Sequence, residues 1–221
     1  MKKTNSLARG LGVVALVAGA LAARPAEARL IDLHAGGYAG GLTGWGSTSG
    51  TPDFFDRRKG PGVGVAVGVK LLIFDLSVNF TQLFDSGGRA GTLTQALVGI
   101  NFDIPVGNQL FTDGIEKGKS RNVLRPIYNV GFAIGTPEPV KPPLDLAQIS
   151  ARGLVSYMGL SYEHFLNEFI GVGAEADFGY HYFVGGGKSM DMTMATTNTL
   201  STHSSGYQLA GFGTVTFHLG Y

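Results

Sequence analysis

Serine and histidine side chains are the residues of this chain that could hydrolyse a lipid or another ester, because that reaction needs a nucleophile beside a base. His203 lies close to Ser205, and His164 lies close to Ser161. Neither pair comes with an evident carboxylate to orient the histidine or with an oxyanion site. Five histidines scattered over 221 residues produce such proximities by accident. We therefore predict no catalytic residue and no enzyme, and a lipid-modifying enzyme ranks last among the functional alternatives.

Three methionines could bind a soft metal. Met190, Met192 and Met194 alternate near His203, and thioether sulfurs favour Cu(I). Methionine is also a common apolar gap filler, and we interpret these three in that way. The chain has no cysteine, so thiolate metal sites and disulfides are excluded. We predict no metal and no cofactor.

The run from Gly114 to Ser120, GIEKGKS, resembles a phosphate-binding loop in composition. Four residues must separate the two glycines of such a loop, and here three do, with no clear helix following. Gly62 and Gly64 are followed by Val67 where a dinucleotide fingerprint requires glycine. We therefore predict no nucleotide site in either segment. Charged residues make up 15% of the chain with a net charge of +1, which suggests no nucleic-acid partner.

The N-terminus has the features of an export signal. Lys2, Lys3 and Arg9 precede an apolar run over residues 11–23, which is too short to span a bilayer as a helix. The sequence Ala-Glu-Ala at residues 26–28 has the small-x-small form that signal peptidase cuts after. We predict a cleaved signal peptide over 1–28 and one domain over 29–221.

The elements that would position any site are strands, because apolar residues recur at every second position. Val63, Val65, Val67 and Val69 alternate with small residues and Lys70. Comparable faces recur along the rest of the chain. They begin near Leu30, Phe74, Ala96, Val130, Leu154, Ile170 and Val215. Together these are eight segments, an even number whose two ends can pair and remove the sheet edges.

The connections alternate between long and short. Residues 45–60, 85–91, 136–152 and 184–206 are rich in glycine, proline, serine, threonine and charge, whereas residues 70–72 and 164–168 form tight turns. Outer-membrane barrels have long outer loops and short periplasmic turns. Residues 105–122 depart from this pattern, since they would form an unusually long periplasmic turn.

The pattern predicts an all-β fold, an eight-stranded antiparallel transmembrane β-barrel with up-and-down meander order. A secreted soluble barrel or sandwich would also alternate, with its apolar face turned inward. The other face favours the membrane barrel, because it carries small and hydroxyl residues and few charges. Lys70, Asp75, Glu175 and Asp177 are the expected lumen charges, pairing with one another and with Arg125 or Arg152.

Aromatic residues sort by height into two girdles, as amphipathic rings prefer both membrane interfaces. The tight turns define the periplasmic side. The outer girdle is predicted to contain Trp45, Phe84, Tyr180, Tyr182 and Tyr207, and the inner one Phe74, Phe102, Tyr128, Phe169 and Tyr221.

The last strand, from Leu209 to Tyr221, has apolar residues at Val215, Phe217 and Leu219 and ends in an aromatic residue. With the export signal, it resembles the β-signal of small outer-membrane barrels of the OmpA, OmpX and OmpW kind, including myxobacterial-type barrels. The resemblance implies an integral outer-membrane location, lipid contact and insertion by the barrel assembly machinery.

That family includes scaffolds, narrow pores and a few enzymes, so function rests on sites. We expect a structural or scaffolding barrel that docks other envelope proteins, as family members do in envelope-spanning machines such as the gliding machinery. The expected docking regions are residues 105–122 and the loop containing Pro137, Pro139, Pro142 and Pro143. A narrow OmpW-like channel for small solutes is the main alternative, since the sequence does not exclude a narrow or gated path through the lumen.

Overall fold

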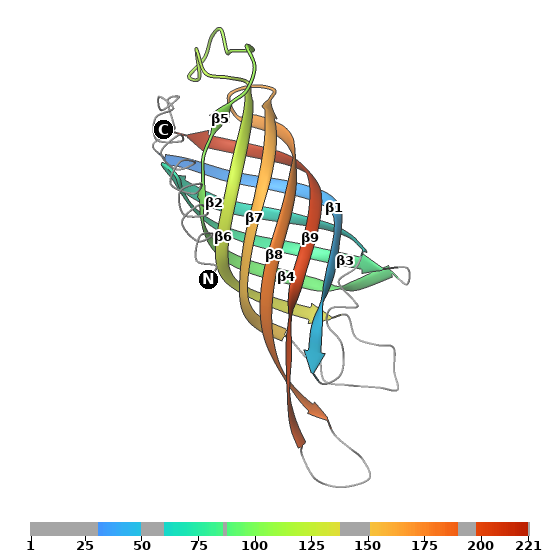
Figure 1. Cartoon of the computed structure of the whole chain (residues 1–221). Helices are drawn as coiled ribbons and strands as arrows, with labels where there is room; N and C mark the ends of the chain where they lie inside the picture. Colours follow the sequence, from blue (N-terminus) through green and yellow to red (C-terminus); the bar gives the residue numbers. More distant parts are fainter. Residues whose placement is uncertain (1–30, 50–59, 86–87, 138–150, 190–197, 221) are drawn as a thin grey trace, which may run out of the picture.

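The computed structural model describes residues 31–49, 60–85, 88–137, 151–189 and 198–220, so the predicted signal peptide lies outside the described residues. Eight long strands and one short strand are described (Figure 1). They are β1 (Ile31–Ser49), β2 (Gly60–Leu71), β3 (Phe74–Asp85), β4 (Gly88–Asn101), β5 (Ile104–Pro105), β6 (Asn122–Pro137), β7 (Ala151–Phe165), β8 (Ile170–Ser189) and β9 (Asn198–Gly220). No helix in these ranges is long and apolar enough to cross a membrane.

The long strands form a closed antiparallel barrel with meander order. Each pairs with the next along the chain, β4 pairs directly with β6, and β9 closes the ring against β1. The closing register runs from Asp32 opposite Gly220 to Ser49 opposite His203. Closure leaves no unpaired edge around the ring, as a sheet in lipid requires. The predicted fold class is therefore confirmed.

Two of the expected outer loops are shorter than predicted. The chain between β3 and β4 is bounded by Asp85 and Gly88, where a loop over 85–91 was expected. Likewise β8 and β9 stay paired as far as Ser189 opposite Asn198, so most of 184–206 is strand. This hairpin projects beyond the other strands (Figure 1). The sequence of this hairpin did not predict strands, because a two-stranded ribbon outside the lipid needs no alternating apolar residues.

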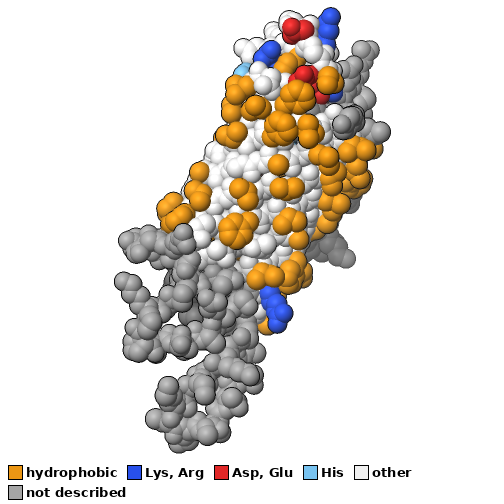
Figure 2. Space-filling view, turned by 180° about the vertical axis from the view of Figure 1, so that it is seen from behind, with side chains coloured by type: hydrophobic (Ala, Val, Ile, Leu, Met, Phe, Trp, Pro, Cys, Tyr) orange, Lys and Arg blue, Asp and Glu red, His pale blue; other side chains and the backbone are white. Residues whose placement is uncertain are grey.

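The outer face of the barrel is apolar. Val63, Val65 and Val67 of β2 are 46%, 56% and 60% exposed, although valine is normally buried in water-soluble proteins. Phe74, Leu76, Val78 and Phe80 of β3 continue the surface, and Figure 2 shows apolar side chains spread over the barrel wall. So large an exposed apolar surface is stable only against lipid. The soluble alternative, with its apolar face turned inward, is therefore wrong.

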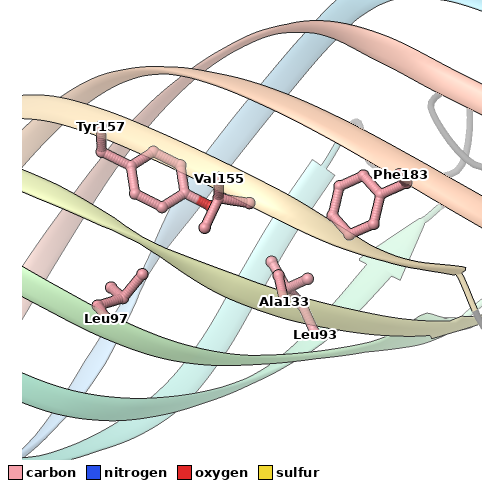
Figure 3. Packing of buried hydrophobic residues seen from close by; sticks show 6 residues of the cluster. All are labelled: Leu93, Leu97, Ala133, Val155, Tyr157 and Phe183. Carbon is pink, nitrogen blue, oxygen red and sulfur yellow. The ribbon is translucent and has the colours of Figure 1, made fainter.

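Apolar side chains also fill the lumen away from the tight turns. Figure 3 shows that Leu93, Leu97, Ala133, Val155, Tyr157 and Phe183 converge from four neighbouring strands, β4, β6, β7 and β8. A second cluster on other strands contains Leu42, Leu83 and Ala210, with Phe212 packed against it. We call the end with the tight turns the periplasmic end, following the loop asymmetry of outer-membrane barrels. The outer half of the lumen is then a packed core, as expected for eight strands.

Candidate functional site

Charged side chains gather in the lumen at the periplasmic end. Asp32 is the second residue of β1, Lys70 is the penultimate residue of β2, and Glu163 and His218 lie near the ends of β7 and β9. All four are nearly inaccessible to solvent. They share the inward parity of their strands, so strand alternation brings them to one level of the barrel.

His218 is the centre of this group, which we call the ionic layer. Its Nδ1 lies 2.7 Å from Asp32 Oδ2, and its Nε2 lies 3.0 Å from Glu163 Oε1. Ionised carboxylates only accept hydrogen bonds, so the ring satisfies both partners when each nitrogen donates. An imidazole that donates from both nitrogens carries a positive charge, which compensates the two buried acids.

Arg125 extends the ionic layer toward the barrel rim. Its Nη1 donates to Glu163 Oε2 at 3.1 Å, and its Nε donates to Asp103 Oδ1 at 2.6 Å. Lys70 Nζ lies 2.8 Å from Asp103 Oδ2, so Asp103 accepts from two cations. Burial by itself would raise the pKa of Asp103, but the charges of Arg125 and Lys70 hold it well below its usual value. Asp103 therefore stays ionised at neutral pH.

The other three predicted lumen charges line a cavity of about 190 Å³ above this layer. Asp75 accepts a hydrogen bond of 2.8 Å from Asn101 Nδ2 and lies 3.7 Å from His34 Nε2. Glu175 and Asp177 are hydrogen-bonded to each other on β8. Of the predicted partners, Arg125 belongs to the ionic layer, whereas Arg152 is exposed near the outer end of β7.

Sequence reasoning missed four members of the ionic layer, namely Asp32, Asp103, Glu163 and His218. A usable signal was present, because His218 shares its face with Thr214 and Thr216 on a strand whose other face is strongly apolar. Inward parity alone therefore places His218 in the lumen. Inward parity does not predict which residues of different strands lie at the same height and contact each other across the lumen.

Glycines opposite the larger lumen side chains make room for them. Tyr157 faces Gly179 across β7 and β8, and a Cβ on this glycine would lie 2.1 Å from the tyrosine ring. Asp177 faces Gly159 across the same pair, where a Cβ would lie 1.9 Å from the carboxylate. Both distances are shorter than any real carbon contact, so each large side chain requires its glycine.

Three of the five aromatic residues predicted for the outer girdle lie on the outer face of the barrel. Tyr180, Tyr182 and Tyr207 point outward and are about two-fifths exposed, and the Tyr180 and Tyr207 rings lie 5.5 Å apart. Phe84 is half-buried beside an irregularity in the β3–β4 register. The Trp45 side chain lies outside the described residues.

At the periplasmic end, Phe74 and Tyr128 point outward, and the half-buried Phe169 stacks on Phe217 with centroids 6.2 Å apart. Phe102 is also half-buried. The proposed β-signal residues form one outward face of β9: Val215, Phe217 and Leu219 are all exposed. Tyr221, assigned both to the inner girdle and to the β-signal, lies outside the described residues.

The other chemical candidates are only partly within the described residues. Ser161 points into the lumen, whereas His164 Nδ1 contacts Asn122 Oδ1 at 2.8 Å. Met190, Met192 and Met194 lie outside the described residues, as does the His203 side chain. Within the described ranges, no group of three or more His, Cys, Asp or Glu is arranged so that it could hold a metal ion. In the run from Gly114 to Ser120, Lys119 pairs with Glu116 at 2.7 Å, and no helix follows.

The long connection between β4 and β6 is an ordered element, which we call the periplasmic extension (residues 102–121). It protrudes beyond the tight turns (Figure 1). β5 pairs with the start of β6, and Arg121 N donates to Gln109 O at 2.8 Å. The Arg121 guanidinium lies 4.5 Å from the centre of the Phe111 ring and donates to Leu166 O at 3.1 Å.

Phe111 anchors the periplasmic extension against the barrel mouth, where it packs with Val123 and Phe165. Ile115 N donates to Glu168 Oε2 at 2.6 Å, which ties the tip of the extension to the turn between β7 and β8. A cavity of about 290 Å³ lies beneath the extension, and Asp32 and Arg125 line it as they line the lumen cavity. The extension therefore covers the periplasmic side of the ionic layer.

The closed ring and the apolar outer wall meet the requirements for a strand protein in lipid. The chain is an integral outer-membrane β-barrel. No family model matches it, and no curated protein matches it. Among solved structures, it is similar to the N-terminal β-barrel domain of Pseudomonas aeruginosa OprF, with 15% identity, a TM-score of 0.44, and coverage of 85% of this chain and 97% of that one. It is also similar to Neisserial surface protein A, with 12% identity, a TM-score of 0.45, and coverage of 85% and 96%.

Proposed function

We propose that the protein is a structural scaffold of the outer membrane, whose periplasmic extension docks another protein of the cell envelope. The observation that carries this proposal is the ordered extension, a rigid element that presents apolar side chains to water at the periplasmic end. The obstructed lumen supports it, because a barrel closed at two levels along its axis is built for stability rather than for passage.

The lumen is obstructed at two levels. The ionic layer closes the periplasmic end with hydrogen bonds from His218 and Arg125 to Glu163. The apolar clusters around Leu97 and Leu42 fill the outer half. A hydrated solute would have to lose its water to pass the apolar level. The scaffold is therefore favoured over the narrow channel.

The docking surface is formed by the apolar residues that the periplasmic extension leaves uncovered. Ile115 is 76% exposed at its tip, Leu110 is 50% exposed, and the neighbouring Leu166 is 53% exposed. Lys117 beside them is exposed as well. The hydrogen bonds of Ile115 N and Arg121 hold this surface in one conformation, which lowers the entropic cost of binding. An apolar centre with a charged rim is typical of protein interfaces.

The test is site-specific photo-crosslinking in cells, with the crosslinker at position 115. We expect a discrete crosslinked product that is lost when Leu110 and Leu166 are both replaced by serine. Thr112→Ser is the matched control, because Thr112 is exposed on the same extension and its replacement removes no large apolar group. If no product forms, or if the control abolishes it equally, the scaffold assignment is wrong.

Conductance separates the scaffold from the channel. The two obstructed levels predict that the purified barrel shows no discrete conductance steps when it is inserted into planar bilayers. Steps whose size changes in Glu175→Gln would favour the channel instead, because Glu175 lines the lumen cavity.

A further inference from the structure

The lumen cavity lies between the ionic layer and the apolar clusters, and its polar walls come from opposite sides of the barrel. β3 contributes Asp75 and Asn79, and β8 contributes Glu175 and Asp177. In the closed ring of eight long strands, β3 and β8 are four places apart in either direction, so they face each other across the axis. Asn101 on β4 lies beside Asp75.

Carboxylates outnumber cations around this space. Six acids line the lumen cavity or belong to the ionic layer beside it: Asp32, Asp75, Asp103, Glu163, Glu175 and Asp177. The cations are Lys70, Arg125 and His218, which is hydrogen-bonded through both ring nitrogens. All three form ion pairs within the ionic layer. Among the described residues, no Lys or Arg nitrogen lies within 4.0 Å of Glu175 or Asp177. The hydrogen bond between those two acids requires one shared proton, and the cavity still keeps an excess of negative charge.

Buried acceptor oxygens supply an independent observation. Asp75 Oδ1, Asn79 Oδ1, Asn101 Oδ1 and Gln208 Oε1 are buried and have no hydrogen-bond partner in the part of the chain that the structure describes. Asn101 is only 5% exposed, and its Nδ2 already donates a hydrogen bond to Asp75. All four residues line the lumen cavity. These four oxygens therefore have no donor, although Lys70 and Arg125 also line the cavity.

We propose that the lumen cavity binds a short alkyl diammonium ion. One ammonium group donates to Asp75 and Asn101 on the β3–β4 wall, and the other donates to Glu175 and Asp177 on the β8 wall. An alkylammonium group carries three N–H donors and one charge, which is the complement of these acceptors. The Tyr38 and Phe212 rings, 5.1 Å apart, line the same space and contact the methylene chain.

The organic cation is favoured over a metal ion for two reasons. The described residues contain no group of three or more His, Cys, Asp or Glu that could hold a metal. The available acceptors are split between two walls, whereas a metal ion needs its ligands around one point. A diammonium ion bridges two separate acceptor groups with a flexible apolar linker.

Isothermal titration of the purified full-length barrel in detergent micelles tests the proposal. The probe is 1,4-diaminobutane at pH 7 and fixed ionic strength. We expect saturable binding of one ion per barrel, and no heat of binding from 1,4-butanediol, which has the same length and no charge. If the diamine gives no saturable binding, or if the diol or sodium chloride gives the same isotherm, the proposal is wrong.

Variants locate the site. Glu175→Gln combined with Asp177→Asn is expected to weaken binding at least about tenfold, since it removes the charges of one wall. Asp113→Asn, an exposed carboxylate on the periplasmic extension, should bind as the native protein does. Heat-dependent gel migration reports whether each variant is folded. If the double variant does not fold, Asp75→Asn replaces it with the same expectation, and unchanged affinity in the folded variant contradicts the site.

Discussion

The two halves of the lumen are held together by different forces. The periplasmic half depends on a continuous series of charged hydrogen bonds from Asp32 through His218, Glu163 and Arg125 to Asp103. The outer half depends on apolar side chains such as Leu97 and Phe183. Buried charges stabilise the fold only when every one has its partner, whereas each buried apolar group contributes to the free energy of unfolding on its own. Removing one member should therefore be more costly in the periplasmic half.

The sharpest test of this difference is Glu163→Ala. It leaves His218 and Arg125 without their shared partner in a buried site, and we expect a loss of about 3–5 kcal/mol in the free energy of unfolding. Urea titration in detergent micelles, followed by circular dichroism, measures it. Asp113→Asn, at an exposed position, is the control and should lie within about 0.5 kcal/mol of the native protein. A loss below about 1 kcal/mol in Glu163→Ala would contradict the coupling of the ionic layer.

Leu97→Ala probes the outer half. The leucine is 5% exposed, and its truncation removes packing against neighbouring apolar groups without leaving a charge unpaired. We expect a loss of about 2–3 kcal/mol in the same titration. The matched control is Leu76→Ala, because Leu76 is 48% exposed on the lipid-facing wall and leaves no cavity in the lumen. Equal losses for Leu97→Ala and Leu76→Ala would show that the outer half is not a packed core.

The smallest expected effect is that of Asp103→Asn at the rim, and it depends on pH. Its side chain is 32% exposed, so screening reduces the contribution of its two ion pairs to about 1 kcal/mol. Lys70 and Arg125 hold the pKa of Asp103 below its ordinary value, so the stabilisation is complete above about pH 4 and declines as the pH falls further. The stability difference from the native protein should be constant from neutral pH down to about pH 5 and narrow below about pH 4. A difference that widens on acidification would reverse the sign of this linkage.

Alternation in the sequence was sufficient to predict the fold, because lipid requires one apolar face on every strand and the valines of β2 meet that requirement directly. Lys70, Asp75, Glu175 and Asp177 line the lumen, yet their partners depended on the register between strands far apart in sequence. Asp32 and His218 are 186 residues apart and meet only because β9 closes against β1. The periplasmic extension was recognised by its length alone, since its irregular hydrogen bonds follow no period.

The pairing of glycines with large lumen side chains links positions that are far apart in a sequence comparison. Tyr157 and Gly179 occupy one space, as do Asp177 and Gly159, so a larger residue at either glycine is tolerated only when its neighbour across the strands becomes smaller. Relatives of this protein should therefore exchange bulk between such partners, keeping the summed volume of each pair while changing both residues. Sequence identity can then fall steeply along a barrel whose interior remains filled.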